Sequence, residues 1–590
     1  MFNKNNLKKN IVACSITILL CIILLIWVMR LWNNDLGIPI GYSGDGLFYG
    51  VMIKGMIDNG WYLNNKYLAA PVGLHLHYDF SLGADSLHYL FIKFISLFSS
   101  NWAVIKNIFI FLTFPLAALS SLLVLRILSL SYACAIVGSL LFTFLPYHFI
   151  RAPGHTFLAS YYAVPLAILL ALWVYSKDPP LLKFNKKSVA CIIICLLLSS
   201  SGMYYAFFAC FFIIVAAISN RSTTKNYRKL ISAGLLVIII CGGVLINISP
   251  SLYRRHKHKE DKLAFIRKPA AAEIYGLKIS QLIFPINGHR LSSLEKLKNR
   301  YNLSAPLVNE NYTTSLGIIG SLGFLLLLFR IIGCNKKLFS NEQGSELMSK
   351  LAILNISAIL LATVGGFSSV FSYTILPIIN AYNRISIFIA FFSLTAFFLF
   401  LESFFKKCSK KRLSTGIQIV ILIIGVLDQT TTYYGTRHAS KERYVNDAEF
   451  IQKLETILPA NAMVFQLPYV PFPEYPSVYK MPDYEHFIAY LHSKTLRWSY
   501  GVLKGSQEDR WQKEVSSKPV NEFLEEISTK GFSGIYLNRS GYVDQGALIE
   551  AKLSLLLNIK PQVSSDNRLV FFDISGYNET HPSHQSLKDF

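Results

Sequence analysis

The chain has 590 residues, of which 53% are hydrophobic and 15% are charged. Soluble domains carry about 25% charged residues, so this composition excludes an ordinary soluble protein for most of the chain. The formal net charge of +23 could indicate nucleic acid binding, but the basic residues form short clusters beside long apolar runs. That arrangement is typical of membrane orientation signals and argues against a nucleic acid partner.

The first apolar run covers residues 11–30 and follows Lys4, Lys8 and Lys9. We interpret it as an uncleaved first span whose basic end stays in the cytoplasm, because the run is too long for a signal peptide and lacks a cleavage site. An interfacial helix on the outer surface is then expected at 86–98. Runs long enough to cross a membrane follow at 103–128, 131–149 and 157–176.

Residues 188–219 lie between two basic clusters, 177–187 and 221–229, which the orientation rule places on the same side of the membrane. An even number of crossings is therefore needed, so we expect the Ser-Ser-Ser-Gly stretch at 199–202 to divide a hairpin of two short spans. The remaining spans are predicted at 230–248, 314–332, 351–370, 385–404 and 413–429. The total of about eleven spans places the C-terminus on the outer side.

This topology predicts a transmembrane bundle over residues 1–435, with two long external segments at 31–102 and 249–313. Residues 436–590 have the composition of a soluble domain. Their periodicity predicts helices at 448–457, 520–529 and 545–557, and strands at 463–467, 532–537 and 569–574. We therefore expect a polytopic α-helical membrane protein with a C-terminal extracytoplasmic α/β domain.

The most informative motif follows the first span: Gly41-Tyr42-Ser43-Gly44-Asp45-Gly46. Glycines let the backbone turn sharply and approach a ligand closely. A carboxylate held there, near the outer membrane face, is suited to act as a general base for a hydroxyl group. A turn with a solvated aspartate is the alternative interpretation.

One span, a long external segment with an early aspartate, an interfacial helix, many further spans and a terminal external domain together resemble the GT-C superfamily of membrane glycosyltransferases. The resemblance implies a catalytic role for Asp45 and a sugar donor on a polyprenyl phosphate or diphosphate. It also implies a glycan, lipid or protein acceptor on the outer face and, commonly, inversion at the anomeric carbon. Many members have two adjacent acids in the first loop, whereas this chain has one. A second carboxylate would come from Asp79, Asp85 or Glu310.

Other short motifs extend the resemblance. The stretch 71–85 resembles the segment before the interfacial helix, and the stretch 146–155 resembles a histidine-containing second external loop. Glu310 with Tyr312 resembles an acidic residue that precedes a later span. The residues expected to be catalytic are Asp45, Glu310 and Asp79. Those expected to bind substrate are Arg384, Arg151, His155, His77, Asp85 and Tyr312.

Arg151 and Arg384 are each the single cation of a short external loop, where the orientation rule expects few. Arg384 resembles the arginine that heads a later span in the family, and its planar fork suits a donor phosphate. Pairing with lipid phosphate is the alternative for both. The Tyr- and Pro-rich stretch 468–482 is expected either to stack a sugar ring or to pack the C-terminal domain onto the bundle.

No cofactor is expected. His75, His77 and Asp79 would share one face of an extended strand and could bind a divalent metal ion, although hydrogen-bonding or surface histidines are the commoner case. A transporter or flippase of lipid-linked sugars and a non-catalytic scaffold are alternative functions. A transporter would place ionisable residues near the bilayer centre, whereas the candidate residues here gather at external ends. The Lys-, Asn- and Ile-rich composition suggests a bacterial inner membrane with a periplasmic C-terminal domain.

Overall fold

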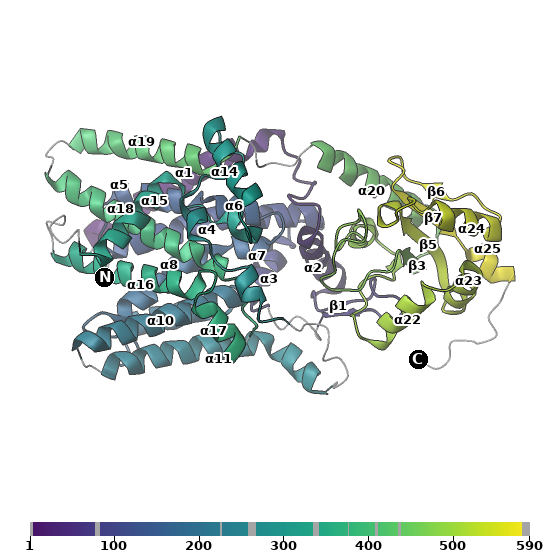
Figure 1. The fold of residues 1–590 in the computed structure, drawn as a ribbon, viewed down its shortest axis with the longest axis horizontal. Helices are drawn as coiled ribbons and strands as arrows, with labels where there is room; N and C mark the ends of the chain where they lie inside the picture. Colours follow the sequence, from purple (N-terminus) through teal and green to yellow (C-terminus); the bar gives the residue numbers. More distant parts are fainter. Residues whose placement is uncertain are drawn as a thin grey trace.

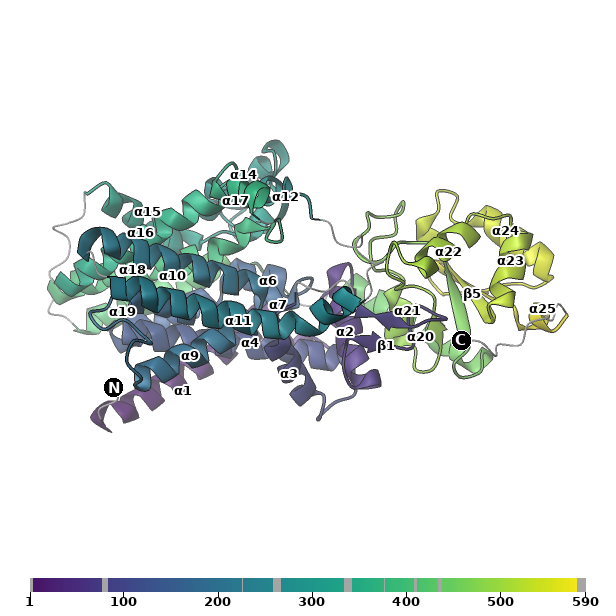
Figure 2. The same cartoon turned by 90° about the horizontal axis from the view of Figure 1, so that it is seen from below.

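A computed structural model describes residues 4–76, 83–224, 227–257, 267–333, 342–375, 377–407, 411–432, 434 and 438–580. A helical bundle forms one part of the molecule, and an α/β domain lies beyond one end of it (Figure 1). The amino terminus lies at the opposite end of the bundle in both views (Figure 2). One end of the bundle therefore holds the amino terminus, and the other end faces the α/β domain.

Helices cover every span predicted from the sequence. In chain order they are α1 (Lys4–Met29), α4 (Trp102–Ile127), α5 (Tyr132–Thr143), α8 (Val164–Val174), α9 (Lys186–Ser199), α10 (Met203–Thr224), α11 (Tyr227–Lys257), α15 (Gly317–Ile331), α16 (Glu342–Ala362), α18 (Ser386–Lys407) and α19 (Lys411–Gln429). Within the described residues, 7 helical stretches are long and apolar enough to cross a membrane. The total of about eleven crossings stays a prediction.

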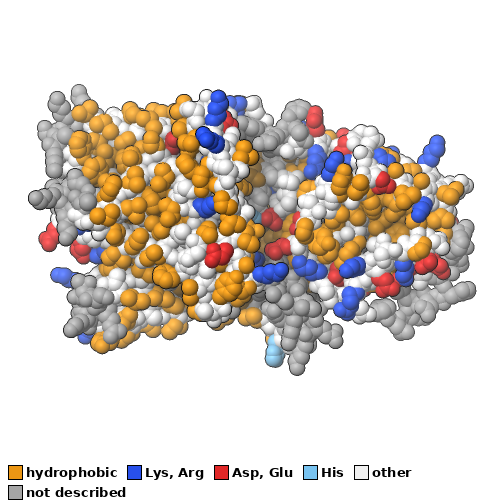
Figure 3. All heavy atoms as spheres, viewed as in Figure 1, with side chains coloured by type: hydrophobic (Ala, Val, Ile, Leu, Met, Phe, Trp, Pro, Cys, Tyr) orange, Lys and Arg blue, Asp and Glu red, His pale blue; other side chains and the backbone are white. Residues whose placement is uncertain are grey.

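The outer surface of the bundle is apolar. Hydrophobic side chains cover most of the bundle face in Figure 3, while charged side chains gather near the C-terminal domain and over it. Leu19, Ile238 and Ile423 are each more than half exposed. Such a broad apolar surface would be unstable in water and suits contact with lipid. The chain is an integral membrane protein.

Two predicted helix boundaries can be compared directly with the structure. The predicted break at 199–202 is confirmed, because α9 ends at Ser199 and α10 begins at Met203. The predicted span 351–370 is wrong at its end, because α16 stops at Ala362. Gly365 there has a φ of +75°, a backbone conformation that favours glycine. The amide of Leu277 bonds to the carbonyl of Ala362, so an external segment takes over the hydrogen bonding of the helix end.

Short elements build the end of the bundle that faces the C-terminal domain. They are α2 (Asp45–Asn59), α3 (Ser86–Ile95), α6 (Pro146–Arg151), α7 (Thr156–Ala159), α12 (Ala271–Ile274), α13 (Ile279–Ile283), α14 (Ser292–Ser304), α17 (Phe367–Thr374), the hairpin of β1 (Asn64–Asn65) and β2 (Leu74–His75), and the 3-10 helices η1 (Leu31–Asn33), η3 (Tyr161–Ala163), η4 (Asn309–Thr313) and η5 (Tyr382–Ile385). Helix α3 matches the predicted interfacial helix. Its start is tied to the α9–α10 turn, because Gly202 N donates to Ala84 O (2.8 Å) and Leu87 N donates to Ser200 O (3.0 Å).

The C-terminal domain is built on a five-stranded sheet in the order β4-β3-β5-β7-β6. Its strands are β3 (Met463–Leu467), β4 (Arg497–Trp498), β5 (Phe532–Asn538), β6 (Gln562–Val563) and β7 (Leu569–Asp573). The sheet is parallel across β4-β3-β5 and antiparallel across β5-β7-β6. Its helices are α20 (His438–Ile457), α21 (Phe487–His492), α22 (Gln507–Val515), α23 (Val520–Thr529), α24 (Ala547–Leu557) and α25 (Ser575–Thr580), with the 3-10 helix η6 (Arg539–Gly541).

This domain is joined to the first external segment at the edge of the sheet. The amide of Trp498 in β4 donates to Tyr67 O (2.8 Å), and Ala70 N donates back to Trp498 O (3.0 Å). Ala69 N donates in the same way to Tyr500 O (2.9 Å). Backbone hydrogen bonds from residues 67–70 therefore tie the edge of the sheet at β4 to the first external segment.

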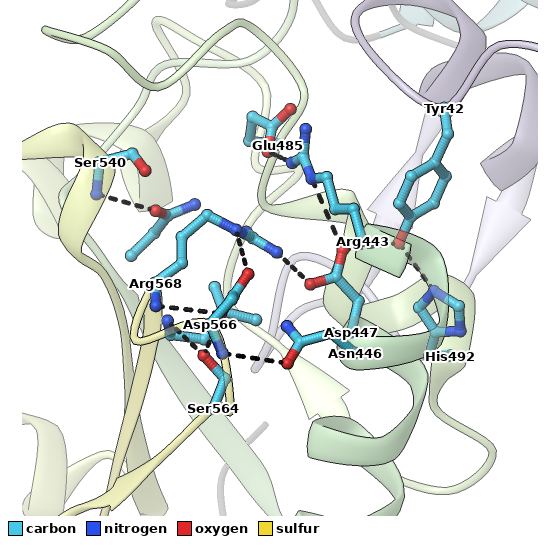
Figure 4. Close-up of polar contacts among 12 residues, drawn as sticks. Tyr42, Arg443, Asn446, Asp447, Glu485, His492, Ser540, Ser564, Asp566 and Arg568 are labelled. Atoms are coloured by element: carbon cyan, nitrogen blue, oxygen red, sulfur yellow. Dashed lines mark hydrogen bonds and ion pairs between the residues drawn. The ribbon is translucent and has the colours of Figure 1, made fainter. Parts of the chain in front are cut away.

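A buried polar network makes a second joint. Tyr42 of the first external segment points into the C-terminal domain, where its hydroxyl lies 3.0 Å from Asp447 Oδ2 and 2.7 Å from His492 Nε2 (Figure 4). Asp447 is also paired with Arg568 and Arg443. Tyr42 is three residues before Asp45, so the domain contacts the glycine-rich turn that carries the candidate base.

Candidate functional site

Asp45 is the first residue of α2, directly after the glycine-rich turn. A carboxylate at a helix N-terminus is favoured by the helix dipole. The turn packs tightly on the second external loop, since a Cβ added to Gly41 would lie 2.3 Å from Pro153 O. Gly41 also has a φ of +81°, so glycine is required there for both conformation and space. The Asp45 side chain remains 42% exposed and accessible to a ligand.

His155 of the second external loop lies between two carboxylates. Its Nδ1 is 3.2 Å from Asp45 Oδ2, and its Nε2 is 3.6 Å from Glu310 Oε1. A protonated imidazole ring in this position can donate to both carboxylates. The three residues come from α2, the loop between α6 and α7, and η4, which are widely separated in the chain.

Glu310 forms ion pairs with two arginines. Arg151 Nη2 donates to Glu310 Oε2 over 2.7 Å, and Arg384 Nη2 lies 3.8 Å from the same oxygen. Burial by itself raises the pKa of Glu310, but Arg384, Arg151 and a hydrogen bond with His155 together hold that pKa well below its usual range. The Glu310 carboxylate is therefore ionised at neutral pH and can anchor both guanidinium groups.

Arg384, at the start of the helix that continues as α18, is stacked on an aromatic ring. Its guanidinium carbon is 4.1 Å from the centre of the Tyr204 ring, and its side chain is 12% exposed. Tyr204 belongs to α10, one residue after the helix begins. This cation–π contact and the Glu310 pair orient the guanidinium group at the edge of a cavity.

The cavity has a volume of about 180 Å³ and is lined by residues from both parts of the molecule. Its polar and charged lining comprises Asp45, Asp85, His155, Ser201, Arg267, Arg384 and Glu474. Its aromatic lining comprises Phe48, Tyr49, Tyr62, Tyr89, Phe157, Tyr204, Tyr205 and Tyr484. Aromatic faces with a few convergent charged groups are the ordinary features of a small-molecule site.

Residues 87–297 match DUF6311, a domain family of unknown function. None of the curated proteins compared with the chain matches it in sequence.

Among solved structures, the chain is similar to the Archaeoglobus fulgidus oligosaccharyltransferase solved with zinc and sulfate, at 12% identity over 89% of this chain and 68% of that chain (TM-score 0.45). It is similar to oligosaccharyltransferase AglB of that organism, solved with an inhibitory peptide and a dolichol-phosphate, at 13% identity over 98% and 75% (TM-score 0.46). It is also similar to the mycobacterial arabinofuranosyltransferase AftD, at 12% identity over 90% of this chain but 36% of that one (TM-score 0.48).

Identities of 12–13% and TM-scores below 0.5 leave the function to be inferred from this chain's own residues.

The residues proposed from the sequence fall into four groups. Asp45, His155, Asp85 and Arg384 line the cavity. Glu310 and Arg151 lie directly behind that lining, in contact with His155 and Arg384 or with each other. Tyr312 is in η4 beside Glu310 but is not part of the lining. His77 and Asp79 lie outside the described residues.

Asp85 lies next to the start of α3, with its Oδ1 3.4 Å from His88 Nδ1. His75, the remaining member of the possible metal-binding set, is on β2 and contacts Asn64 Oδ1 through its Nδ1 (2.8 Å). In the described part of the chain, no group of three or more His, Cys, Asp and Glu residues is arranged to hold a metal ion.

The aromatic lining and two of the charged lining residues, Arg267 and Glu474, were not proposed as site residues from the sequence. Arg267 lies on the external segment after α11, and its Nη2 is 3.8 Å from Glu474 Oε1 of the C-terminal domain. Tyr484 lies near Glu474, and its hydroxyl accepts a hydrogen bond from the Glu474 amide (3.2 Å). Glu474 falls within the Tyr- and Pro-rich stretch 468–482, whose composition was the available signal.

Proposed function

We propose that the chain is a membrane glycosyltransferase of the GT-C type. It transfers a sugar from a polyprenyl phosphate or diphosphate to a hydroxyl group of a glycan, lipid or protein acceptor at the outer membrane face. The observation that carries the proposal is the convergence of Asp45, His155 and Arg384 on one aromatic-lined cavity at the end of the bundle that faces the C-terminal domain.

Asp45 is assigned as the general base. It accepts the proton of the acceptor hydroxyl while that oxygen forms a bond to the anomeric carbon of the donor sugar. The bond from that carbon to the phosphate oxygen breaks, and its electron pair leaves with the phosphate. A single displacement of this kind inverts the anomeric centre. His155, 3.2 Å from Asp45 Oδ2, orients the carboxylate.

Arg384 is assigned to the leaving group. Negative charge grows on the departing phosphate oxygen, and a guanidinium fork can bind it through two hydrogen bonds. The group is preorganised by Tyr204 and Glu310 on its protein side, so little motion is needed when the donor binds. Glu310 and Arg151 lie behind the lining, which supports a positioning role for both in place of the direct roles expected from the sequence.

The aromatic lining suits sugar rings, whose C–H faces pack on aromatic planes. Tyr62 and Tyr89 are stacked on each other, with ring centres 3.8 Å apart, so the second ring fixes the plane of the first. The flippase alternative expects charged groups along a path through the bundle. The cluster here is confined to loops and short helices at one end, which favours chemistry at one membrane face.

The test compares cells that carry the wild-type gene, a deletion, Asp45→Asn or Asp35→Asn, using mass spectrometry of surface glycans and lipids. Asp35 is the matched control, since it lies in the same external segment and its carboxylate accepts a hydrogen bond from the amide of Gly37 (2.8 Å). Deletion and Asp45→Asn are expected to remove the same sugar from the same molecule, whereas Asp35→Asn retains it. One base contributes about 10²–10⁴-fold to the rate.

An unchanged glycan and lipid profile in the deletion strain would refute the proposal. So would a full sugar content in Asp45→Asn at wild-type protein levels, because the carboxylate would then have no part in transfer.

A further inference from the structure

A fully buried lysine lies on the largely apolar helix α4. Lys106 is on α4, one turn after that helix begins, and its side chain is inaccessible to solvent. Its ammonium group donates to three backbone carbonyl oxygens: Gly41 O (3.1 Å), Gly46 O (3.0 Å) and Pro153 O (3.2 Å). An ammonium group has three N–H donors, so all three are used.

The three carbonyl groups belong to the two segments that form the candidate centre. Gly41 and Gly46 are the two ends of the turn that carries Asp45, and Pro153 is two residues before His155. The ammonium group therefore joins the base-bearing turn to the histidine-bearing loop. Space at this junction is minimal, since a Cβ on Gly46 would lie 2.6 Å from Pro153 O.

The next residue of α4 continues the contact with the first external segment. Asn107 accepts a hydrogen bond from Ile40 N (2.9 Å) and donates to Leu36 O (2.9 Å) and Ile38 O (2.8 Å). Asn107 is also buried. Two adjacent polar side chains on α4 thus bind the backbone from residue 36 to residue 46.

Burying an ammonium group without partners is costly, because its hydration is lost. A methionine or leucine at 106 would avoid that cost, yet it would remove the donor that three buried or partly buried carbonyl groups share. The lysine at 106 is therefore explained by the hydrogen bonds that join the Asp45 turn to the His155 loop.

We propose that Lys106 is a positioning residue that sets the spacing between Asp45 and His155. This inference rests on the proposed function, in which that pair forms the base. Lys106 contacts no substrate and acts through the backbone of both segments. A displacement of about 1 Å at a reacting group can lower a rate by about 100-fold, so loosening this junction lowers kcat.

The test compares purified wild-type protein with Lys106→Met, Lys106→Gln and Lys93→Met. Lys93 is the matched control, since its ammonium group also donates to carbonyl groups of the first external segment, Met56 O (3.4 Å) and Gly60 O (3.1 Å), away from the turn. Hydrogen–deuterium exchange reports on residues 41–47 and 153–159, and steady-state kinetics report on sugar transfer.

Lys106→Met is expected to exchange faster in both segments and to lower kcat by about 10- to 100-fold with donor KM unchanged. Lys106→Gln keeps two donors and gives an intermediate result, which also serves if the methionine variant does not fold. Lys93→Met matches wild type in both segments and in kcat.

Exchange measurements do not depend on sugar transfer, so they decide the structural claim even if the proposed function fails. Wild-type exchange in both segments, a uniform increase across the whole protein, or a kcat within about twofold of wild type in folded Lys106→Met would each overturn the inference.

Discussion

The Tyr42 hydroxyl lies 3.0 Å from Asp447 Oδ2, a contact between residues 405 positions apart in the chain. Tyr42 is buried against the C-terminal domain and is three residues from Asp45. The C-terminal domain therefore contacts the glycine-rich turn through Tyr42, while Lys106 binds the backbone of the same turn.

Replacing Tyr42 with phenylalanine removes this hydroxyl and leaves the ring in place. Asp447 and His492 then lose a buried partner, and we expect the free energy of unfolding to fall by about 1–3 kcal/mol. Thermal unfolding of the purified protein measures the change. Tyr475→Phe is the control, because Tyr475 is 42% exposed in the same domain. Equal melting temperatures for wild type and Tyr42→Phe would contradict a stabilising contact.

Replacing Arg384 with lysine keeps a positive charge and removes the planar fork. We expect donor use to suffer more than acceptor use, since only the donor carries phosphate. The loss of one bidentate contact should raise donor KM or lower kcat by about 10-fold or more. Arg300→Lys, on the exposed face of α14, is the control. Normal donor kinetics in Arg384→Ala would show that the guanidinium group binds no phosphate.

Glu310 gives a prediction with a defined pH window. Its folded pKa is held below the unfolded value of about 4.3, so its ion pairs contribute stability that is fully present above that unfolded value. That contribution declines as pH falls below about 4.3 towards the folded pKa. The difference in melting temperature between wild type and Glu310→Gln should therefore be constant from about pH 8 to 5.5 and shrink in more acidic buffer. A difference that grows on acidification would exclude an ionised Glu310.

Membrane orientation can be tested independently of chemistry. A periplasm-specific reporter fused after residue 590 should be active, because basic clusters place the amino terminus in the cytoplasm and the C-terminal domain lies at the opposite end of the bundle. A second fusion in the basic cluster at 177–187 should be inactive. Activity that appears only in the cytoplasm would reverse the orientation and move the cavity to the inner face.

The sequence predicted individual members of the site but not their grouping. Asp45 stood out for its glycine-rich motif, Arg384 as the single cation of a short external loop, and His155 through the resemblance of the stretch 146–155. That Arg384 and Arg151 share one carboxylate of Glu310 depends on how distant helices pack, which local patterns do not encode. Lys106 gave no signal, since a lysine near the end of an apolar helix usually extends to the membrane surface.

For secondary structure, too, local patterns predicted some elements, whereas others depend on contacts with distant parts of the chain. Long regular elements such as β3 and α23 begin and end at the predicted residues, because their periodicity is local. The two-residue strands β4 and β6 are defined only by their partners, and no pattern of that length is informative. The helix predicted over 351–370 ran too far because Gly365 and Gly366 lie within an apolar run, where glycine does not always end a helix.

The backbone pairing of residues 67–70 with β4 means that the soluble-looking end of this chain is not an autonomous module. Expressed alone from residue 436, it would present an open strand edge at β4, which is a template for self-association. Adding residues 60–76 as a peptide should restore the backbone hydrogen bonds to Trp498 and Tyr500 and reduce that self-association. The gene therefore divides a single folding unit between two distant stretches, and a truncation at residue 435 would damage both.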